Sequence, residues 1–247
     1  MRENIKVSII ISTLNSEKTL SDCIQSCLDQ NFPNKEIIII DGKSEDQTIN
    51  IIKTFSSKSL FYISEKDDGI YDAWNKALSI CKGEWICFLG SDDRWVSRNS
   101  LKRLFENTHN KEVNFISAKV KIVNKYNNLF SIMGKRWNYN KLWLNIQIAH
   151  PGALHKKTLF DNFGKFNKEF KIAGDHEFLI RAGDSVNANF LDEIIIEMQD
   201  EGISKKKPYK AFFESYLAIS NNNNFGKIKG IIFLVLSIFK YNFKKII

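Results

Sequence analysis

Short apolar runs and longer mixed segments alternate over residues 1–90. The apolar runs are rich in Ile, Val and Phe, so we predict strands that are buried on both faces. The predicted strands are Val7–Ser12, Glu36–Asp41, Leu60–Ser64 and Glu84–Leu89, and the helices between them are Glu17–Asp29, Asp46–Phe55 and Ile70–Cys81. This alternation predicts an α/β fold with a mainly parallel central sheet flanked by helices.

The rest of the chain is less regular. We predict helices at Ser97–Glu106 and Asp175–Ala182, strands at Val113–Val123, Leu129–Met133 and Phe190–Met198, a short strand after Gly152, and turns at Lys125–Asn128 and Gly202–Ser204. We expect one domain over residues 1–204, with halves of about 1–95 and 96–204, and a helical extension over residues 205–247. Asn221–Asn224 predicts a linker before the last helix.

Polar residues follow each of the four strands predicted in the first half. They are Thr13 and Asn15, then Asp41, Gly42 and Ser44, then Asp67, and finally Asp92 and Asp93. Ligands of parallel sheets bind beyond the carboxyl ends of the strands. Turn chemistry accounts for one or two such groups, but four at one edge indicate a functional site.

Asp92 and Asp93 are adjacent carboxylates after a buried strand. They repel one another unless a positive group lies beside them, and hard oxygen ligands suit Mg²⁺ or Mn²⁺ holding a diphosphate. The alternative is a helix cap, with Ser91 or Asp92 capping the next helix.

Asp41 ends a strand that contains four isoleucines. Its carboxylate can accept a hydrogen bond from the imide N–H of a base or from a ribose hydroxyl. Gly42 allows close approach of the backbone, and Ser44 can cap the next helix. The alternative is a plain strand-to-helix turn, which would leave Asp41 without a partner.

Four segments resemble family 2 glycosyltransferases with the GT-A fold. They are Asp41-Gly42-x-Ser44-x-Asp46-x-Thr48, Ser64-Glu65-x-Asp67-x-Gly69-Ile70-Tyr71-Asp72-Ala73-x-Asn75-Lys76, Gly83–Asp93, and Asp175-His176-Glu177-Phe178. The resemblance covers residues 5–204. Within the family, the segments are similar to those of bacterial enzymes of cell-surface polysaccharide synthesis, of the colanic-acid, capsule and O-antigen type. It implies inverting transfer of a hexosyl or N-acetylhexosaminyl group. The donor would be a nucleotide-diphosphate sugar, with UDP favoured, and the acceptor a glycan or lipid-linked hydroxyl.

The resemblance also implies roles for individual residues. Asp175 would be the base that takes the proton of the acceptor hydroxyl, with Glu177 as second choice. A divalent cation, Mn²⁺ or Mg²⁺, would be held by Asp93 and Asp92, with His150 as a further candidate ligand. The expected donor contacts are Thr13, Asn15, Asp41, Gly42, Ser44, Asp67, Lys76 and Asp92, and the expected acceptor contacts are Trp137, Trp143, His150, Gly202 and Ser204.

Structural alternatives accompany several of these roles. Asp175 can cap the helix that it begins, which would lower its pKa, and Lys76 can be a solvated helix lysine. We expect His109 and His155 at the surface. A core position is the alternative for His150 and for the aromatic cluster of Trp137, Tyr139 and Trp143.

The formal net charge of +8 is concentrated at the end of the chain. Residues 205–247 contain nine lysines and one acidic residue, Glu214. On a helical projection Ile228, Ile231, Ile232, Val235, Phe239 and Phe243 lie on one side, and Lys229, Ser237, Lys240 and Lys244 on the other. The apolar run from Gly230 to Phe239 is about half as long as a bilayer span. We therefore predict a basic amphipathic helix, peripheral at the inner face of the cytoplasmic membrane. Docking on the catalytic domain or a homodimer interface is the alternative.

Other features disfavour whole classes of function. Cys23, Cys27, Cys81 and Cys87 form no CxxC pair, so buried thiols in a reducing cytoplasm are expected rather than a zinc site. Residues 1–13 do not have the pattern of a signal peptide. No glycine-rich basic loop follows the first strand, which disfavours a nucleotidyltransferase. The acidic pair and Asp175 disfavour a degenerate, non-catalytic relative, and no nucleic-acid partner is expected because the basic excess lies in the tail.

Overall fold

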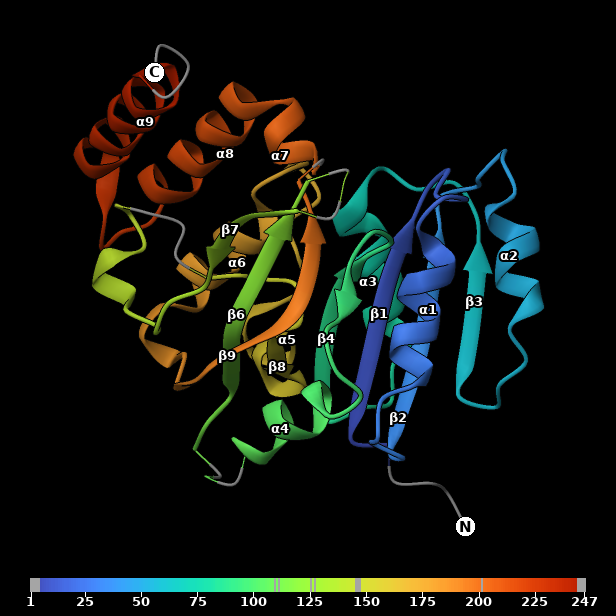
Figure 1. Cartoon of the computed structure of the whole chain (residues 1–247). Helices are drawn as coiled ribbons and strands as arrows, with labels where there is room; N and C mark the ends of the chain where they lie inside the picture. Colours follow the sequence, from blue (N-terminus) through green and yellow to red (C-terminus); the bar gives the residue numbers. More distant parts are fainter. Residues whose placement is uncertain are drawn as a thin grey trace.

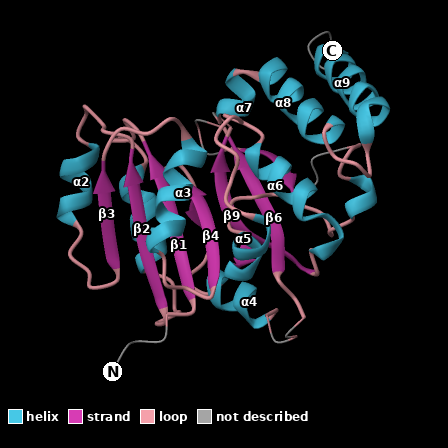
Figure 2. Ribbon diagram, turned by 180° about the vertical axis from the view of Figure 1, so that it is seen from behind, coloured by secondary structure: helices cyan, strands magenta, loops and turns pink. Residues whose placement is uncertain are grey.

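The computed structural model of the chain describes residues 5–108, 110, 112–124, 126, 128–144, 148–200 and 202–243. Within these residues, one nine-stranded sheet has the order β3-β2-β1-β4-β8-β6-β9-β5, and β7 pairs with β6 outside this path. Helices cover both faces of the sheet (Figures 1 and 2). The expected α/β fold is confirmed.

Strands and helices alternate in the first half, as the hydrophobic pattern predicts. The elements are β1 (Val7–Thr13), α1 (Leu20–Leu28), β2 (Lys35–Asp41), α2 (Thr48–Thr54), β3 (Leu60–Ser64), α3 (Ile70–Ile80), β4 (Trp85–Gly90), β5 (Arg94–Trp95) and α4 (Ser100–Glu106). Strand β1 lies between β2 and β4, and β2 pairs with β3, all in parallel.

The second half adds strands of both directions. Its elements are β6 (Phe115–Val123), β7 (Leu129–Met133), η1 (Tyr139–Lys141), β8 (Leu154–Lys156), α5 (Lys157–Phe163), α6 (Gly174–Ala182), η2 (Gly183–Ser185), β9 (Ala188–Gln199), α7 (Ile203–Lys206), α8 (Pro208–Ser220) and α9 (Gly226–Phe243). The long strands β6 and β9 pair in parallel, whereas the short strands β5, β7 and β8 are antiparallel to their neighbours. The parallel pairings are the longer ones, and the short antiparallel strands make the described sheet a mixed one.

Alternate residues of the parallel strands enter two hydrophobic cores, because successive side chains of a strand point to opposite faces. Ile10 and Ile38 pack on the side of α3, α5 and α6. Ile9 and Ile37 pack on the side of α1, α2 and α4. Burial on both faces explains why these strands are continuous apolar runs in the sequence.

Several details differ from the expectations. Strand β3 is at the edge of the sheet, so its Phe61 and Tyr62 are 48% and 40% exposed and not buried on both faces. Gly202 precedes the short helix α7 where a turn was expected. Strand β5 and helix α5 were not predicted, because segments this short have no clear hydrophobic period. His109 and part of the expected Lys125–Asn128 turn lie outside the described residues.

The last two helices pack against one another, and Asn221–Asn224 connects them as predicted. A Cβ on Gly230 of α9 would come within 2.0 Å of the Ser220 hydroxyl of α8, so glycine allows this close approach. Figure 1 places α7, α8 and α9 at the end of the molecule toward which the β1 and β6 arrows point. Among the described helices, none combines the length and the apolar character needed to cross a bilayer.

His155 is fully buried, which contradicts its expected surface position. Its ring centroid lies 4.8 Å from that of His150 and 4.9 Å from that of Phe115. The ring nitrogens of both histidines are buried without hydrogen-bond partners in the described part of the chain. Burial lowers the pKa of His150 to about 3, and burial together with His150 lowers the pKa of His155 well below its usual value. Both rings are therefore neutral in the folded protein at pH 7.

These two histidines bind protons in the unfolded chain below their usual pKa of about 6.5 but not in the folded protein. Each should therefore reduce the free energy of unfolding by about 1.4 kcal/mol per pH unit as the pH falls below that value. His155→Phe removes one such group, so its stability should depend less steeply on pH by about that amount. Urea denaturation at several pH values measures both slopes. If the free energy of unfolding depends equally on pH in the two proteins, His155 is not a buried neutral histidine.

Candidate active site

The carboxyl ends of β1, β2, β3 and β4 lie level with one another. Thr13 is opposite Asp41, Asp41 is opposite Ser64, and Ser12 is opposite Gly90. Figure 1 shows these strands pointing to the same edge of the sheet, which we call the carboxyl edge. The polar groups that follow the four strands are thus brought to one place.

Asp41 organises the turn after β2. Its fully buried carboxylate accepts hydrogen bonds from the backbone N–H groups of Lys43 (3.1 Å) and Ser44 (3.0 Å) and from the hydroxyls of Ser44 and Ser64 (2.6 Å for Ser64). Asp41 therefore has partners within the turn and on the next strand, whereas a plain strand-to-helix turn was expected to leave it without one. Ser44 does not cap α2, because the N-cap is Gln47 and no side chain caps this helix.

Asp67 lies against the same turn. A Cβ on Gly42 would come within 2.8 Å of Oδ2 of Asp67, so glycine is needed for this contact. Oδ1 of Asp67 accepts a hydrogen bond from the N–H of Gly69 at 2.9 Å. The segments after β2 and β3 are therefore in direct contact.

The loop after β1 connects the loops after β2 and β4. The N–H of Asn15 donates to the Ser44 hydroxyl at 2.8 Å, and its side-chain oxygen accepts from the N–H of Glu45 at 2.9 Å. Ser16 and Ser91 share a hydroxyl–hydroxyl hydrogen bond of 2.7 Å. Asn15 has a φ of 49°, a left-handed conformation that asparagine adopts more readily than most residues.

Asp92 and Asp93 lie in a turn between β4 and β5, so the helix-cap alternative is wrong. Oδ2 of Asp93 accepts a hydrogen bond from the N–H of Gly90 at 2.7 Å. Oδ1 of Asp93 is buried and has no hydrogen-bond partner in the described chain. Burial, and then the charge of Asp92, raise the pKa of Asp93 well above its usual value.

A divalent cation fits this acidic pair. A buried carboxylate oxygen without a partner is costly, and Asp93 presents one next to Asp92. A Cβ on Gly90 would come within 2.8 Å of Oδ1 of Asp92 and 3.3 Å of Oδ2 of Asp93, so both carboxylates lie beside Gly90. The described residues contain no group of three His, Cys, Asp or Glu side chains that could hold a metal. Ligands beyond the pair would come from water or a bound phosphate.

Tyr71 of α3 connects Asp175 to the segment after β3. Its hydroxyl lies 3.0 Å from Oδ1 of Asp175 and 2.8 Å from the carbonyl oxygen of Ile172. A Cβ on Gly174 would come within 2.8 Å of the Tyr71 ring, so glycine allows the ring to pack here. Sequence reasoning gave Tyr71 no role, although Tyr71 lies in the motif around Gly69 that carries the family resemblance.

Asp175 is in the first turn of α6 and does not cap it. The N-cap residue is Ala173, and no side chain caps this helix. Burial raises the pKa of Asp175, and the hydrogen bonds from the His176 amide and the Tyr71 hydroxyl lower it by less. The expected lowering of this pKa is therefore wrong. A raised pKa suits a general base, because proton transfer is most effective when the pKa lies near the working pH.

Glu177 and His176 have other partners. Glu177 forms a two-pronged ion pair with Arg181, with N–O distances of 2.7 and 3.0 Å. Both oxygens of Glu177 are thus engaged by Arg181, which favours Asp175 over Glu177. The Nε2 atom of His176 lies 3.1 Å from the carbonyl oxygen of Leu142.

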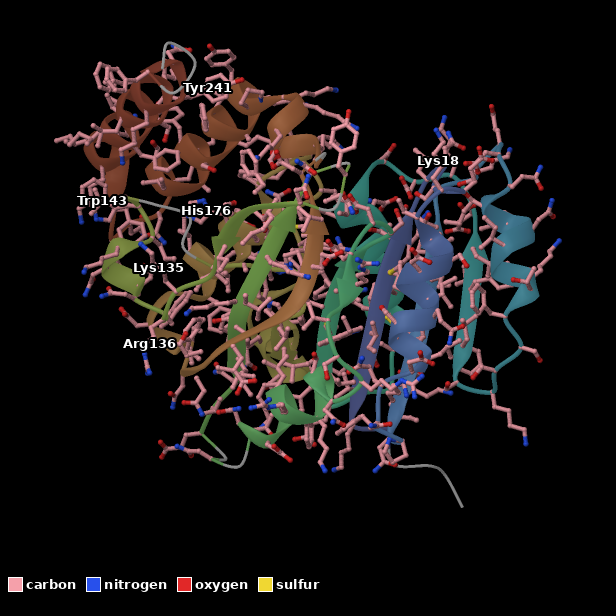
Figure 3. All side chains as sticks on the ribbon, viewed as in Figure 1. Lys18, Lys135, Arg136, Trp143, His176 and Tyr241 are labelled. Carbon is pink, nitrogen blue, oxygen red and sulfur yellow. The ribbon has the colours of Figure 1, made fainter. Side chains whose placement is uncertain are left out.

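The aromatic acceptor candidates are partly exposed and also pack on the core. The Trp137 ring lies 6.0 Å from that of Phe115. The Trp143 ring lies 5.7 Å from the ammonium group of Lys229 in α9. Figure 3 shows Trp143 beside the C-terminal helices, on the opposite side of the molecule from Lys18 in the loop after β1.

The remaining candidates are dispersed. Lys76 pairs with Glu65 at 2.9 Å and with Asp72 at 3.7 Å. The buried His150 ring stacks on Trp74 with a centroid distance of 5.1 Å. Gly202 and Ser204 begin α7, where Ser204 is exposed.

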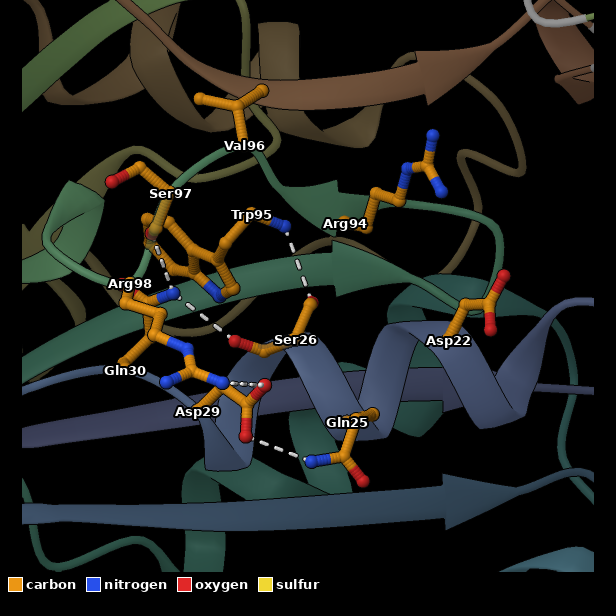
Figure 4. Close-up of a pocket in the computed structure, with 10 residues that line it drawn as sticks. All are labelled: Asp22, Gln25, Ser26, Asp29, Gln30, Arg94, Trp95, Val96, Ser97 and Arg98. Carbon is orange, nitrogen blue, oxygen red and sulfur yellow. Dashed lines mark hydrogen bonds and ion pairs between the residues drawn. The ribbon is translucent and has the colours of Figure 1, made fainter.

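A cavity of about 310 Å³ lies between α1 and the segment around β5 (Figure 4). Its lining includes Asp29 and Arg98, which pair at 3.6 Å, and Trp95, whose backbone N–H donates to the Ser26 hydroxyl at 3.2 Å. None of the predicted site residues lines this cavity. Its interactions are internal to the fold, and we assign it no function.

The fold and the acidic carboxyl edge are those of an α/β protein, a class whose ligands bind beyond the carboxyl ends of parallel strands. The model of the family "Glycosyl transferase family 2" matches residues 8–168. The chain belongs to this family. It is a glycosyltransferase with the GT-A fold, as the sequence motifs predict.

Three named relatives are bacterial glycosyltransferases. The PGL/p-HBAD biosynthesis glycosyltransferase of Mycobacterium bovis is 28% identical over 177 residues, which are 70% of this chain and 68% of the relative. The UDP-Glc:alpha-D-GlcNAc-diphosphoundecaprenol beta-1,3-glucosyltransferase WfgD of Escherichia coli is 32% identical over 163 residues, with coverage of 64% and 62%. The poly(ribitol-phosphate) beta-N-acetylglucosaminyltransferase TarS of Staphylococcus aureus is 31% identical over 196 residues, which are 75% of this chain and 33% of TarS.

Solved structures show the same fold. Residues 1–349 of S. aureus TarS in complex with UDP-GlcNAc superpose with a TM-score of 0.72 and 23% identity, covering 94% of this chain and 71% of that one. The mannosyltransferase PcManGT from Pyrobaculum calidifontis, in complex with GDP-Man and Mn²⁺, gives a TM-score of 0.66 and 18% identity, with coverage of 88% and 62%.

Proposed function

We propose that this glycosyltransferase moves a hexosyl or N-acetylhexosaminyl group from a nucleotide-diphosphate sugar, with UDP favoured, to a hydroxyl of a growing bacterial surface glycan. The observation that carries the proposal is the acidic pair at the carboxyl edge, in which Asp93 is buried and Asp92 is half-buried. The separate carboxylate of Asp175 is connected to the segment after β3 by Tyr71. Two relatives support a UDP-sugar, since WfgD is a UDP-Glc-dependent glucosyltransferase and TarS was solved in complex with UDP-GlcNAc.

The acidic pair is assigned to the diphosphate end of the donor. Asp93 and Asp92 would hold Mn²⁺ or Mg²⁺, which would neutralise the charge of the departing diphosphate. The Mn²⁺ in the PcManGT complex supports this choice of cofactor. Thr13, whose buried hydroxyl has no hydrogen-bond partner in the described chain, is assigned to the nucleoside. Asp41 keeps Gly42 and Ser44 in place, and Asn15 and Asp67 complete this donor surface.

Asp175 is assigned as the base. It would accept the proton of the acceptor hydroxyl while that oxygen attacks the anomeric carbon from the face opposite the diphosphate, which inverts the configuration. Its carboxylate has the Tyr71 hydroxyl, backbone amides and the neighbouring His176 as partners, whereas Glu177 is paired with the guanidinium of Arg181. Asp175 therefore has the environment of a base, and Glu177 that of a structural ion pair.

We also propose that α9 attaches the protein to an anionic membrane surface, where a lipid-linked acceptor would be located. Gly230 and Phe233 pack inward, whereas the opposite side of α9 is exposed. The exposed apolar side chains are Ile228 (76%), Ile231 (53%), Ile232 (40%), Val235 (60%), Leu236 (37%), Phe239 (65%) and Phe243 (52%). This side is not docked on the catalytic domain, and lysines 227, 229 and 240 flank it. An exposed apolar stripe with lysines at its flanks is typical of interfacial helices.

Asp93→Asn tests the metal-dependent donor site. The wild-type protein should release UDP from a UDP-sugar only with Mn²⁺ or Mg²⁺, and UDP with the metal should raise its Tm. Asp93→Asn should lose both effects, with at least a hundredfold slower release, because the carbonyl of asparagine is a weaker metal ligand than a carboxylate. Asp161→Asn, an exposed change on α5, is the control. Wild-type protein that shows neither release nor stabilisation with any UDP-, GDP- or dTDP-sugar would refute the proposed function.

Asp175→Asn tests the base. The variant should keep the stabilisation by UDP and metal but lose at least a hundredfold in kcat, because asparagine cannot accept the proton. Only the ionised carboxylate of Asp175 can act. Since burial raises its pKa, the wild-type rate should fall as the pH drops through a value above about 3.9. The kcat–pH profile measures this acid limb. Unchanged kcat in Asp175→Asn would transfer the role to another group.

Val235→Ser combined with Phe239→Ser tests the membrane contact. Both side chains are exposed, so the fold should persist while sedimentation with vesicles of anionic phospholipid falls at least tenfold. Leu129→Ser combined with Ile132→Ser, which removes exposed apolar side chains from β7, is the matched control and should still sediment. High salt should weaken the wild-type binding. If the α9 variant instead dissociates a dimer in size-exclusion chromatography, a second copy covers this side.

A further inference from the structure

Glu214 of α8 binds three consecutive backbone amides. Its Oε2 atom accepts hydrogen bonds from the N–H groups of Lys171 (3.0 Å), Ile172 (2.7 Å) and Ala173 (3.0 Å). The Glu214 side chain is 7% exposed, and its nearest cation is Lys210, at 4.0 Å one helical turn away. Hydrogen bonds from amides to an ionised carboxylate are short and strong, so this contact is more than ordinary helix packing.

The segment that Glu214 binds leads directly into α6. Ala173 is the N-cap residue, and Asp175 is the second residue of the helix. The N–H of Ile172 is bound by Glu214, and its carbonyl oxygen lies 2.8 Å from the Tyr71 hydroxyl, which also contacts Asp175. The segment is therefore held on one side by α8 and on the other by α3.

Burying a carboxylate is costly unless its oxygens are satisfied. Here the cost is offset by amides that would otherwise lack partners, because they precede the helix and lie outside the sheet. Glu214, the sole acidic residue of residues 205–247, therefore binds the segment that precedes α6. Glu214 also lies beyond residues 8–168, which the family model matches.

We infer that Glu214 is a positioning residue, which fixes Lys171–Ala173 so that α6 presents Asp175 to the acceptor hydroxyl at the carboxyl edge. The inference rests on the proposed role of Asp175 as the base. It assigns to α8 a part in catalysis in addition to its part in the core.

The test separates turnover from donor binding. Glu214→Ala should lower kcat for UDP release at least tenfold, while KM for the UDP-sugar changes less than about twofold, because the donor contacts are on other elements. Glu214→Gln keeps one oxygen acceptor and should recover most of kcat. Ala218→Gly, a buried change elsewhere in α8, should lower the Tm and leave kcat unchanged.

Hydrogen exchange provides a readout that does not need activity. The amides of Lys171–Ala173 should exchange much faster in Glu214→Ala than in the wild-type protein and in Ala218→Gly. Unchanged exchange, or kcat equal to wild type below the Tm, would overturn the inference. If the alanine variant does not fold, Glu214→Asp, with the same charge on a shorter side chain, replaces it in both measurements. A wrong assignment of Asp175 as the base would be recognised separately, because Asp175→Asn would then remain active.

Discussion

The site depends on buried carboxylates that accept hydrogen bonds from backbone amides. Turns after parallel strands leave amides that no neighbouring strand can pair. Asp41 binds two such amides after β2, and Asp93 binds the amide of Gly90 at the end of β4. Glu214 binds three amides in the segment before α6. Each carboxylate fixes a short stretch of backbone, so the side chains that this stretch carries have defined positions.

The carboxylates of this fold differ in how their charge is balanced. Glu177 has a guanidinium partner, and Asp41 has two hydroxyls and two amides. Asp93 has one amide, a neighbouring carboxylate and one oxygen without a partner in the described residues. The charge that remains unbalanced in the protein alone is therefore located where a cation and a diphosphate would supply the balance.

Much of the fold could be predicted because both faces of its long strands are buried. Continuous apolar runs rich in Ile defined β1 and β2, and the polar residues after them indicated the edge of the sheet where we propose the site. The same rule failed for β3, since its pattern does not reveal that it is an edge strand. His155 was misplaced because its burial depends on Phe115 and His150, which are brought near by β6 and the segment before β8.

The partners within the site were less predictable, because they are far apart in the chain. Asp41 is completed by Ser64, Asp175 by Tyr71, and the segment before Asp175 by Glu214. Pattern analysis could place each of these residues on an element but could not pair them, since pairing depends on how strand order brings the elements together. Of these three partners, Tyr71 was the easiest to find from the sequence, because it lies in the most specific motif of the family resemblance.

The C-terminal helices connect these arguments. Helix α8 contacts the catalytic core through Glu214 and, on another side, α9, whose outer side is apolar and exposed. A membrane bound to α9 would therefore be connected to the segment of Asp175 through two packed helices and one carboxylate. Because close-packed protein interiors transmit strain, the position of α9 on a membrane and that of the segment before Asp175 would be coupled through the same pair of helices.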